Sequence, residues 1–132
     1  MAANLERIQQ QMQTELEKFK AVQKDLQKLI NTRQQLDAQL NENKVVQEEL
    51  DIIEPDGNVY KLTGPVLVKQ DLEEAKQNVG KRIEYITAEL KRNEAGIKDV
   101  EKKRGTSQET LSKLQQQYQQ YQQFLTKAAA KA

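Results

Sequence analysis

Residues 55–69 read PDGNVYKLTGPVLVK and separate two long amphipathic patterns. The first four of these residues predict a turn, because proline presets φ and glycine tolerates a positive φ. Two short runs rich in β-branched and aromatic residues follow, one on each side of Gly64-Pro65. This arrangement predicts a β-hairpin over residues 58–69, in which Gly64 supplies the positive φ of a type II′ turn and Pro65 takes its second position. A helical crossover is the alternative.

The predicted hairpin carries apolar side chains on both faces. With this loop Leu62 faces Leu67 and shares its side with Tyr60, and the valines at 66 and 68 point the other way. Two strands cannot cover both faces, and an isolated hairpin is marginal in water with edges that invite more strands. We therefore expect hairpins from several chains to merge into one sheet or barrel. The residues of this expected assembly hairpin are Val59, Tyr60, Leu62, Gly64, Pro65, Val66, Leu67 and Val68.

The patterns on either side predict two long helices, over residues 4–51 and 71–126. Apolar residues recur at steps of three and four, which keeps them on one stripe. Two helices of similar length joined by a short segment predict an antiparallel coiled coil, with both termini at one end. The expected fold class is thus mainly α, as one domain over residues 1–132. The stripe of the second helix is Ile83, Ile86, Leu90, Asn93, Ile97, Val100, Arg104, Ser107, Leu111, Leu114, Tyr118, Tyr121 and Leu125.

The stripe of the first helix is less regular. Its alternation slips between Met12 and Val22, which predicts a local change of the supercoil. Polar residues also fall where the pattern requires apolar ones, and buried polar residues of this kind can fix register and partner choice. These polar positions are Arg33, Asn43 and Gln47. The apolar positions are Leu5, Ile8, Met12, Leu16, Phe19, Val22, Leu26, Leu29, Leu36, Leu40 and Leu50.

Composition argues for long helices and against an enzyme. Only 36% of the 132 residues are hydrophobic, 5% are aromatic, and the net charge is +1. The chain has no histidine and no cysteine, so imidazole catalysis, thiol chemistry, disulfides and the usual zinc ligands are excluded. The carboxylate pairs at 48–49 and 73–74 lie on helix faces without a pocket to desolvate them. We expect no catalytic residues, no metal and no cofactor.

The charge balance and hydropathy also exclude some partners. A nucleic-acid-binding domain would carry a basic stripe, whereas here basic and acidic residues nearly cancel. No apolar run approaches the ~20 residues that a membrane span requires. We expect no nucleic-acid partner, no membrane partner and a cytoplasmic location.

The two ends of the chain form the second candidate site. In an antiparallel arrangement they come together, and helix ends fray and expose apolar side chains. Methionine and aromatic residues make adaptable contacts with varied partners. An ordinary low-complexity helix end is the alternative. The residues expected at this binding tip are Leu5, Ile8, Met12, Tyr121, Phe124 and Leu125.

The hairpin, set between two coiled-coil helices, resembles the signature of β-class prefoldin subunits. Residues 79–92, VGKRIEYITAELKR, are more similar to the eukaryotic subunit-six group than to archaeal β subunits. The resemblance covers residues 5–124. It implies a heterohexamer of α-class and β-class subunits whose hairpins build a β-barrel platform. It also implies an ATP-independent co-chaperone that captures unfolded actin and tubulin at its tips and delivers them to the cytosolic group II chaperonin.

A coiled-coil tether or scaffold subunit without client binding is the competing hypothesis. The helical stripes alone suit such a spacer equally well. The hairpin discriminates between the two, because a spacer has no need of it.

Overall fold

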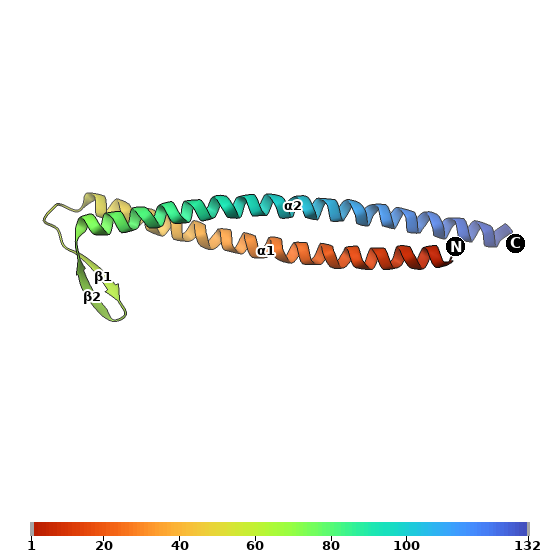
Figure 1. Cartoon of the computed structure of the whole chain (residues 1–132), viewed down its shortest axis with the longest axis horizontal. Coiled ribbons are helices and arrows are strands. Elements are labelled where there is room, and N and C mark those ends of the chain that lie inside the picture. The colour runs from red at the N-terminus through yellow and green to blue at the C-terminus, as the bar shows by residue number, and fades with distance from the viewer. Residues whose placement is uncertain (1, 132) are drawn as a thin grey trace. The chain divides into compact units, whose positions relative to one another are not determined.

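The computed structural model describes residues 2–131, with four elements in that part of the chain (Figure 1). They are α1 (Ala2–Ile52), β1 (Val59–Thr63), β2 (Val66–Gln70) and α2 (Leu72–Lys131). The chain divides into two compact units. We call Met1–Leu29 with Gly96–Ala132 the terminal unit, and Ile30–Ala95 the hairpin unit.

The β-hairpin has the predicted register. Strands β1 and β2 are antiparallel, with Leu62 opposite Leu67 and Thr63 opposite Val66, so that Gly64-Pro65 forms a two-residue loop. Gly64 has φ of 58°, and no residue other than glycine among residues 2–131 has a positive φ. Positive φ at the first loop position alone is the geometry of a type II′ turn, whose twist matches that of the strands. The prediction of a hairpin in place of a helical crossover is confirmed.

Helix α2 begins directly after β2 because Asp71 caps it. The backbone N–H of Glu74 donates a hydrogen bond to Oδ2 of Asp71 at 3.2 Å, as expected for an aspartate at the N-cap. Glu73 and Glu74 place negative charge in the first turn, where the helix dipole favours it. Helix α1 ends at Ile52, three residues before Pro55, and the N–H of Gly57 donates to the carbonyl of Glu54 at 2.8 Å to form the following turn.

In the terminal unit, α1 and α2 run antiparallel. Nε2 of Gln9 donates a hydrogen bond to the hydroxyl of Tyr118 at 3.0 Å, and Oγ of Ser107 donates to Oε1 of Glu15 at 2.8 Å. Farther along α1, the side chain of Leu29 lies against Gly96, 3.7 Å from the position that a Cβ would take. Residue numbers rise in α1 as their partners' numbers fall in α2, which confirms the antiparallel pairing within this unit.

The residues that face inward between α1 and α2 are here called the seam. In the terminal unit the seam is more regular than the sequence predicted. Leu16 is 42% exposed, and Glu15 takes the inward position instead. The three–four alternation on α1 therefore continues without the expected slip between Met12 and Val22. The buried residues of this seam are Ile8, Leu26, Ile97 and Ser107. Its half-buried α1 residues are Leu5, Met12, Glu15, Phe19, Val22 and Leu29.

The core of the hairpin unit lies where the helices meet the hairpin. Leu50, Ala75 and Val79 form a buried cluster, with further apolar side chains packed against it. These partly buried residues are Ile53, Val59, Leu72 and Ile83. Val59 is the hairpin residue that joins this core, so the core fixes the base of β1 and leaves the rest of the hairpin outside.

Polar seam positions of the hairpin unit behave differently from one another. Asn93 is buried, and Asn43 and Gln47 are half-buried, as the pattern predicted. Arg33 is exposed, and its Nε lies 4.0 Å from Oδ2 of Asp37, one turn along the same helix. A long cationic side chain can leave a seam in this way because its stem is flexible.

Candidate binding surfaces

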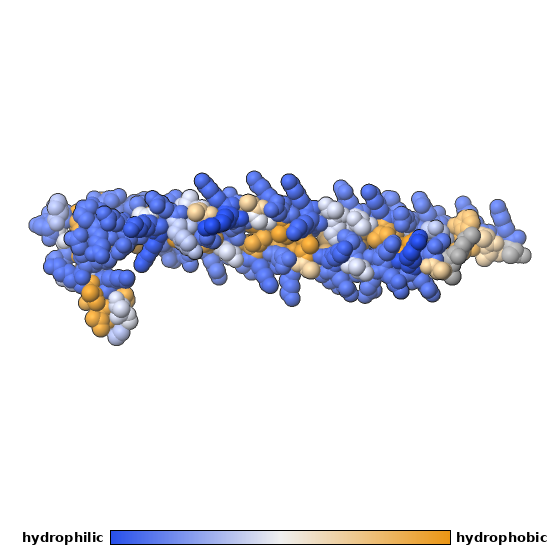
Figure 2. All heavy atoms as spheres, viewed as in Figure 1, coloured by the Kyte–Doolittle hydropathy of each residue, from blue (hydrophilic) through white to orange (hydrophobic). Residues whose placement is uncertain are grey.

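The hairpin exposes its apolar side chains on both faces. Tyr60, Leu62 and Leu67 lie on one face, and Val66 and Val68 lie on the other. Each of the five is at least half exposed, from 50% for Val68 to 68% for Leu62. Figure 2 shows hydrophobic residues at the hairpin beside a largely hydrophilic helical surface. Exposed apolar side chains that gather on one element in this way are typical of interaction sites.

The backbone of the hairpin is also half unpaired. The sheet has two strands, so each strand has one edge without a neighbour in the described part of the chain. An unpaired edge presents N–H and C=O groups that a further strand can satisfy. Gly64 and Pro65 are exposed at the turn, and Val59 is half-buried at the base. The structure thus brings the predicted assembly residues together on one projecting element.

The residues predicted for the binding tip all lie in the terminal unit, but with different exposure. Ile8 is buried, at 2% exposure, and belongs to the seam. Leu5, Met12, Tyr121 and Leu125 are half-buried. Phe124 is 52% exposed. With Asn4, Gln120 and Tyr121 it lines an open groove of about 440 Å³. The assignment of these residues to client binding stays a prediction.

A second groove of the terminal unit was not predicted. It has a volume of about 540 Å³ and is lined by four apolar or aromatic side chains and three glutamines. The apolar and aromatic members are Met12, Leu16, Leu111 and Tyr118. Leu16 reaches this groove because it lies one position off the stripe. That offset was visible in the sequence, where it was interpreted as a change of supercoil.

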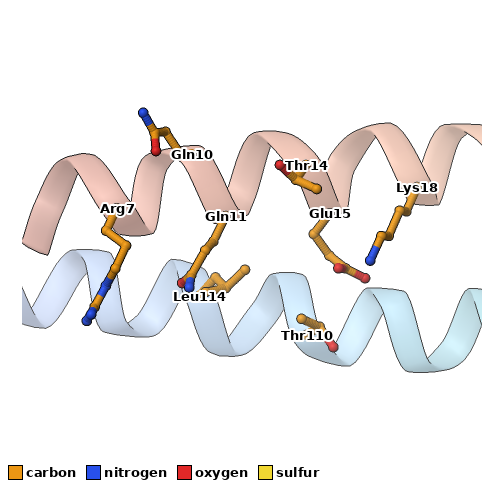
Figure 3. Close-up of a pocket in the computed structure, with 8 residues that line it drawn as sticks. All are labelled: Arg7, Gln10, Gln11, Thr14, Glu15, Lys18, Thr110 and Leu114. Carbon is orange, nitrogen blue, oxygen red and sulfur yellow. The ribbon is translucent and has the colours of Figure 1, made fainter.

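A third groove of the terminal unit, of about 550 Å³, is predominantly lined by polar residues. Figure 3 shows Gln11 and Glu15 directed from α1 toward α2, while Gln10 points away from it. Arg7 and Lys18 contribute cationic side chains to the lining, with Leu114 as its apolar member. The seam therefore has grooves of different chemistry beside it, one apolar and rich in glutamine, the other polar and charged.

The described residues hold no cluster of side chains that could bind a metal ion. Among residues 2–131 no three His, Cys, Asp or Glu side chains are close enough to hold a metal ion. The carboxylates of Glu48, Glu49, Glu73 and Glu74 are exposed on the helices. Neither helix, as far as it is described, has an apolar segment long enough to span a membrane.

Comparisons with known proteins match nearly the whole chain. Residues 10–118 match a family model described as prefoldin subunit. Human prefoldin subunit 6 is 49% identical over 127 residues, covering 96% of this chain and 98% of the relative. Prefoldin subunit 6 of Arabidopsis thaliana is also 49% identical, over 121 residues, 92% of this chain and 94% of the relative. The crystal structure of the prefoldin beta subunit from Thermococcus strain KS-1 superimposes with a TM-score of 0.65 at 26% identity, covering 84% and 91% of the two chains.

Proposed function

The chain belongs to the prefoldin family, and from this premise we propose that it is one subunit of a heterohexameric chaperone complex that holds unfolded proteins. In this proposal the complex captures clients such as actin and tubulin and delivers them to the cytosolic group II chaperonin. It works without ATP, by binding energy alone. The subunit itself acts in the cytoplasm and is not an enzyme.

The single observation that carries the proposal is the exposed hairpin. Five large apolar side chains are exposed to solvent on two strands, and the outer edges of these strands lack neighbours in the described chain. Fully burying a leucine or valine side chain gains roughly 1.5–3 kcal/mol, so covering these five strongly favours association. Strand addition from α-class and β-class neighbours covers the faces and pairs the edges at once, and so builds a β-barrel platform. One hairpin per chain fits the β class.

The grooves of the terminal unit support the holding role. An unfolded chain offers extended backbone and scattered apolar side chains. The groove lined by Met12, Leu16 and Tyr118 offers adaptable apolar contacts, and its glutamines offer amide donors and acceptors. Shallow contacts of this kind give weak, broad binding. Phe124 and Tyr121 extend the same chemistry toward the predicted tip.

Assembly is tested by charging the hairpin. Leu62→Asp with Leu67→Asp places two carboxylates opposite each other on the face that the neighbours cover. We expect this double variant to be absent from the complex when it is mixed with its cognate subunits and measured by native mass spectrometry. The matched control, Leu62→Val with Leu67→Val, keeps the pair apolar and should assemble. Normal assembly of the Asp variant would favour the tether hypothesis.

Client holding is tested separately on the assembled complex. Removal of residues 1–12 and 118–132 deletes all four lining residues of the groove at Phe124 and three of the seven lining residues of the groove at Leu16, and it leaves the hairpin unit intact. The truncated complex should keep its stoichiometry but lose suppression of the aggregation of denatured actin, followed by light scattering without nucleotide. Full suppression by the truncated complex would overturn the assignment of client binding to the tip of the terminal unit.

A further inference from the structure

One side of the hairpin unit carries two hollows where exposed helix residues meet the base of the hairpin. A crevice of about 150 Å³ lies between the base of the hairpin and the helices, with Val46, Tyr60 and Arg82 in its lining. A groove of about 410 Å³ shares Arg82 with the crevice and is also lined by Tyr85 and Ile86. The shared residue makes the two hollows neighbours on one continuous surface.

The exposed side chains of this surface are of the kind that carries binding energy. Tyr85 is 65% exposed, Tyr60 is 54% exposed and Val46 is 46% exposed. Tyrosine and arginine are enriched among the few residues that dominate protein interfaces. At about 150 Å³ the crevice has room for a group the size of benzene, which is the size of one large apolar side chain, between apolar and polar lining residues.

The charge of the surface has one sign. Lys61, Lys81 and Arg82 line the two hollows, and neither lining includes an aspartate or a glutamate. Within residues 2–131 these three cations form no ion pair with the chain's own carboxylates. A partner that fits must bring carboxylates beside an apolar side chain, because charge complementarity steers and orients association.

The surface is also continuous with the proposed assembly hairpin. Val59, Tyr60 and Lys61 of β1 and Gln70 of β2 line the crevice, so a chain that pairs with the hairpin lies next to it. A bound neighbour would therefore reach the crevice without a separate docking step.

We propose that Val46, Tyr60, Lys61, Lys81, Arg82 and Tyr85, here called the basic aromatic surface, form a second contact with the neighbouring prefoldin subunit. The neighbour inserts one apolar side chain into the crevice and places flanking carboxylates against Lys61, Lys81 and Arg82. This inference rests on the proposed assembly and adds to it a contact that selects the neighbour by charge. Strand pairing is largely indifferent to sequence, so a charged contact beside it supplies the selectivity that the hairpin lacks.

The test is charge reversal on the chain within its cognate subunit mixture. Lys81→Glu with Arg82→Glu should weaken incorporation into the complex at least about tenfold in a subunit titration, because repulsion replaces attraction. Raising the salt concentration should weaken incorporation of the wild type, because it screens the attraction, and should improve incorporation of the double variant, because it screens the repulsion. Tyr85→Ala should also lower the affinity of the subunit for the complex about tenfold, whereas Tyr85→Phe should retain most of that affinity. The matched control is Lys91→Glu, an exposed lysine of the same unit that lines neither hollow.

The outcomes separate this inference from the proposed function. Unchanged affinity and salt dependence for the Lys81→Glu, Arg82→Glu variant would overturn the second contact and leave the assembly hairpin standing. Intact assembly of the Leu62→Asp, Leu67→Asp variant would instead overturn the proposed function. Self-association of the purified chain that the charge reversal abolishes would identify a second copy as the occupant and would also overturn the inference. Far-ultraviolet circular dichroism of each variant should match the wild type, because every substituted residue is exposed.

Discussion

Single side chains determine where the two helices of the terminal unit meet. Ile97 is 7% exposed in the seam, and Leu16, a residue of similar size, is 42% exposed beside it. Between these extremes Glu15 is half-buried and accepts a hydrogen bond from the buried hydroxyl of Ser107 at 2.8 Å. A hydrogen bond to a charged acceptor is worth roughly 1.5–3 kcal/mol, enough to keep a carboxylate in a position that otherwise favours leucine.

The contrast between Ile97 and Leu16 gives a prediction about stability. Ile97→Ala should lower the free energy of unfolding of the purified chain by about 2–4 kcal/mol, since it removes buried methyl groups and leaves a void. Leu16→Ala should lower it by less than about 1 kcal/mol, because its side chain already contacts water. Urea denaturation followed by circular dichroism measures both. Equal losses for the two variants would contradict the exposure of Leu16.

Ile97, Leu16 and Glu15 show how much of the seam and its grooves the sequence predicts. Periodicity alone identified the seam of α2 correctly from Ile83 to Leu125, because each position there keeps the three–four rule. It misplaced Leu16 because an apolar residue one step off the stripe looks like a change of period. The hydrogen bond from Ser107 that holds Glu15 inward is a contact between helices, and one helical pattern cannot show it. The groove beside Leu16 was missed for the same reason.

At the scale of elements, local turn chemistry determines the hairpin, and helix propensity determines how far α2 extends at its C-terminal end. Gly64-Pro65 specified the loop, and the observed pairing of Leu62 with Leu67 follows from its length. Helix α2 extends to Lys131, beyond the last apolar stripe residue at Leu125. Alanine and lysine have high helix propensity, so this segment stays helical without a partner on the stripe. The pattern could not predict that extension, because periodicity reports packing and not backbone preference.

Two glycine-to-alanine substitutions should have opposite effects on these elements. Gly64→Ala forces a Cβ into a left-handed conformation and should destabilise the hairpin by about 1–2 kcal/mol. Gly105 lies inside α2, and a Cβ added there would have no neighbouring atom within 4 Å. Gly105→Ala should therefore stabilise the helix by up to about 1 kcal/mol, because alanine has the higher helix propensity. Hydrogen exchange of peptides from residues 59–70 and from around residue 105 should speed up in the first variant and slow down in the second. Slower exchange at 59–70 in Gly64→Ala would contradict the type II′ turn.

At the scale of the whole molecule, the chain buries little apolar surface in either unit. No described side chain of large volume is completely buried, and the buried apolar residues lie along narrow seams or in the small cluster around Leu50. A larger core is unattainable for a composition with 36% hydrophobic residues in long helices. In the proposed complex, the five large exposed apolar side chains of the hairpin are the surface that other subunits cover. Folding of the hairpin and assembly should be thermodynamically linked.

This linkage predicts where assembly protects the backbone. In the isolated chain, strands Val59–Thr63 and Val66–Gln70 have only each other as partners, and amides on their outer edges should exchange rapidly with deuterium. With cognate subunits at a hundred times their dissociation constant, exchange of those amides should slow by about a hundredfold, because only the unbound fraction opens. Peptides from the terminal unit serve as the internal control and should change little, since in the proposed complex the neighbours bind the hairpin unit. Protection that appears in the terminal unit and not in the hairpin would show that subunits associate through their helices and would contradict assembly by strand addition.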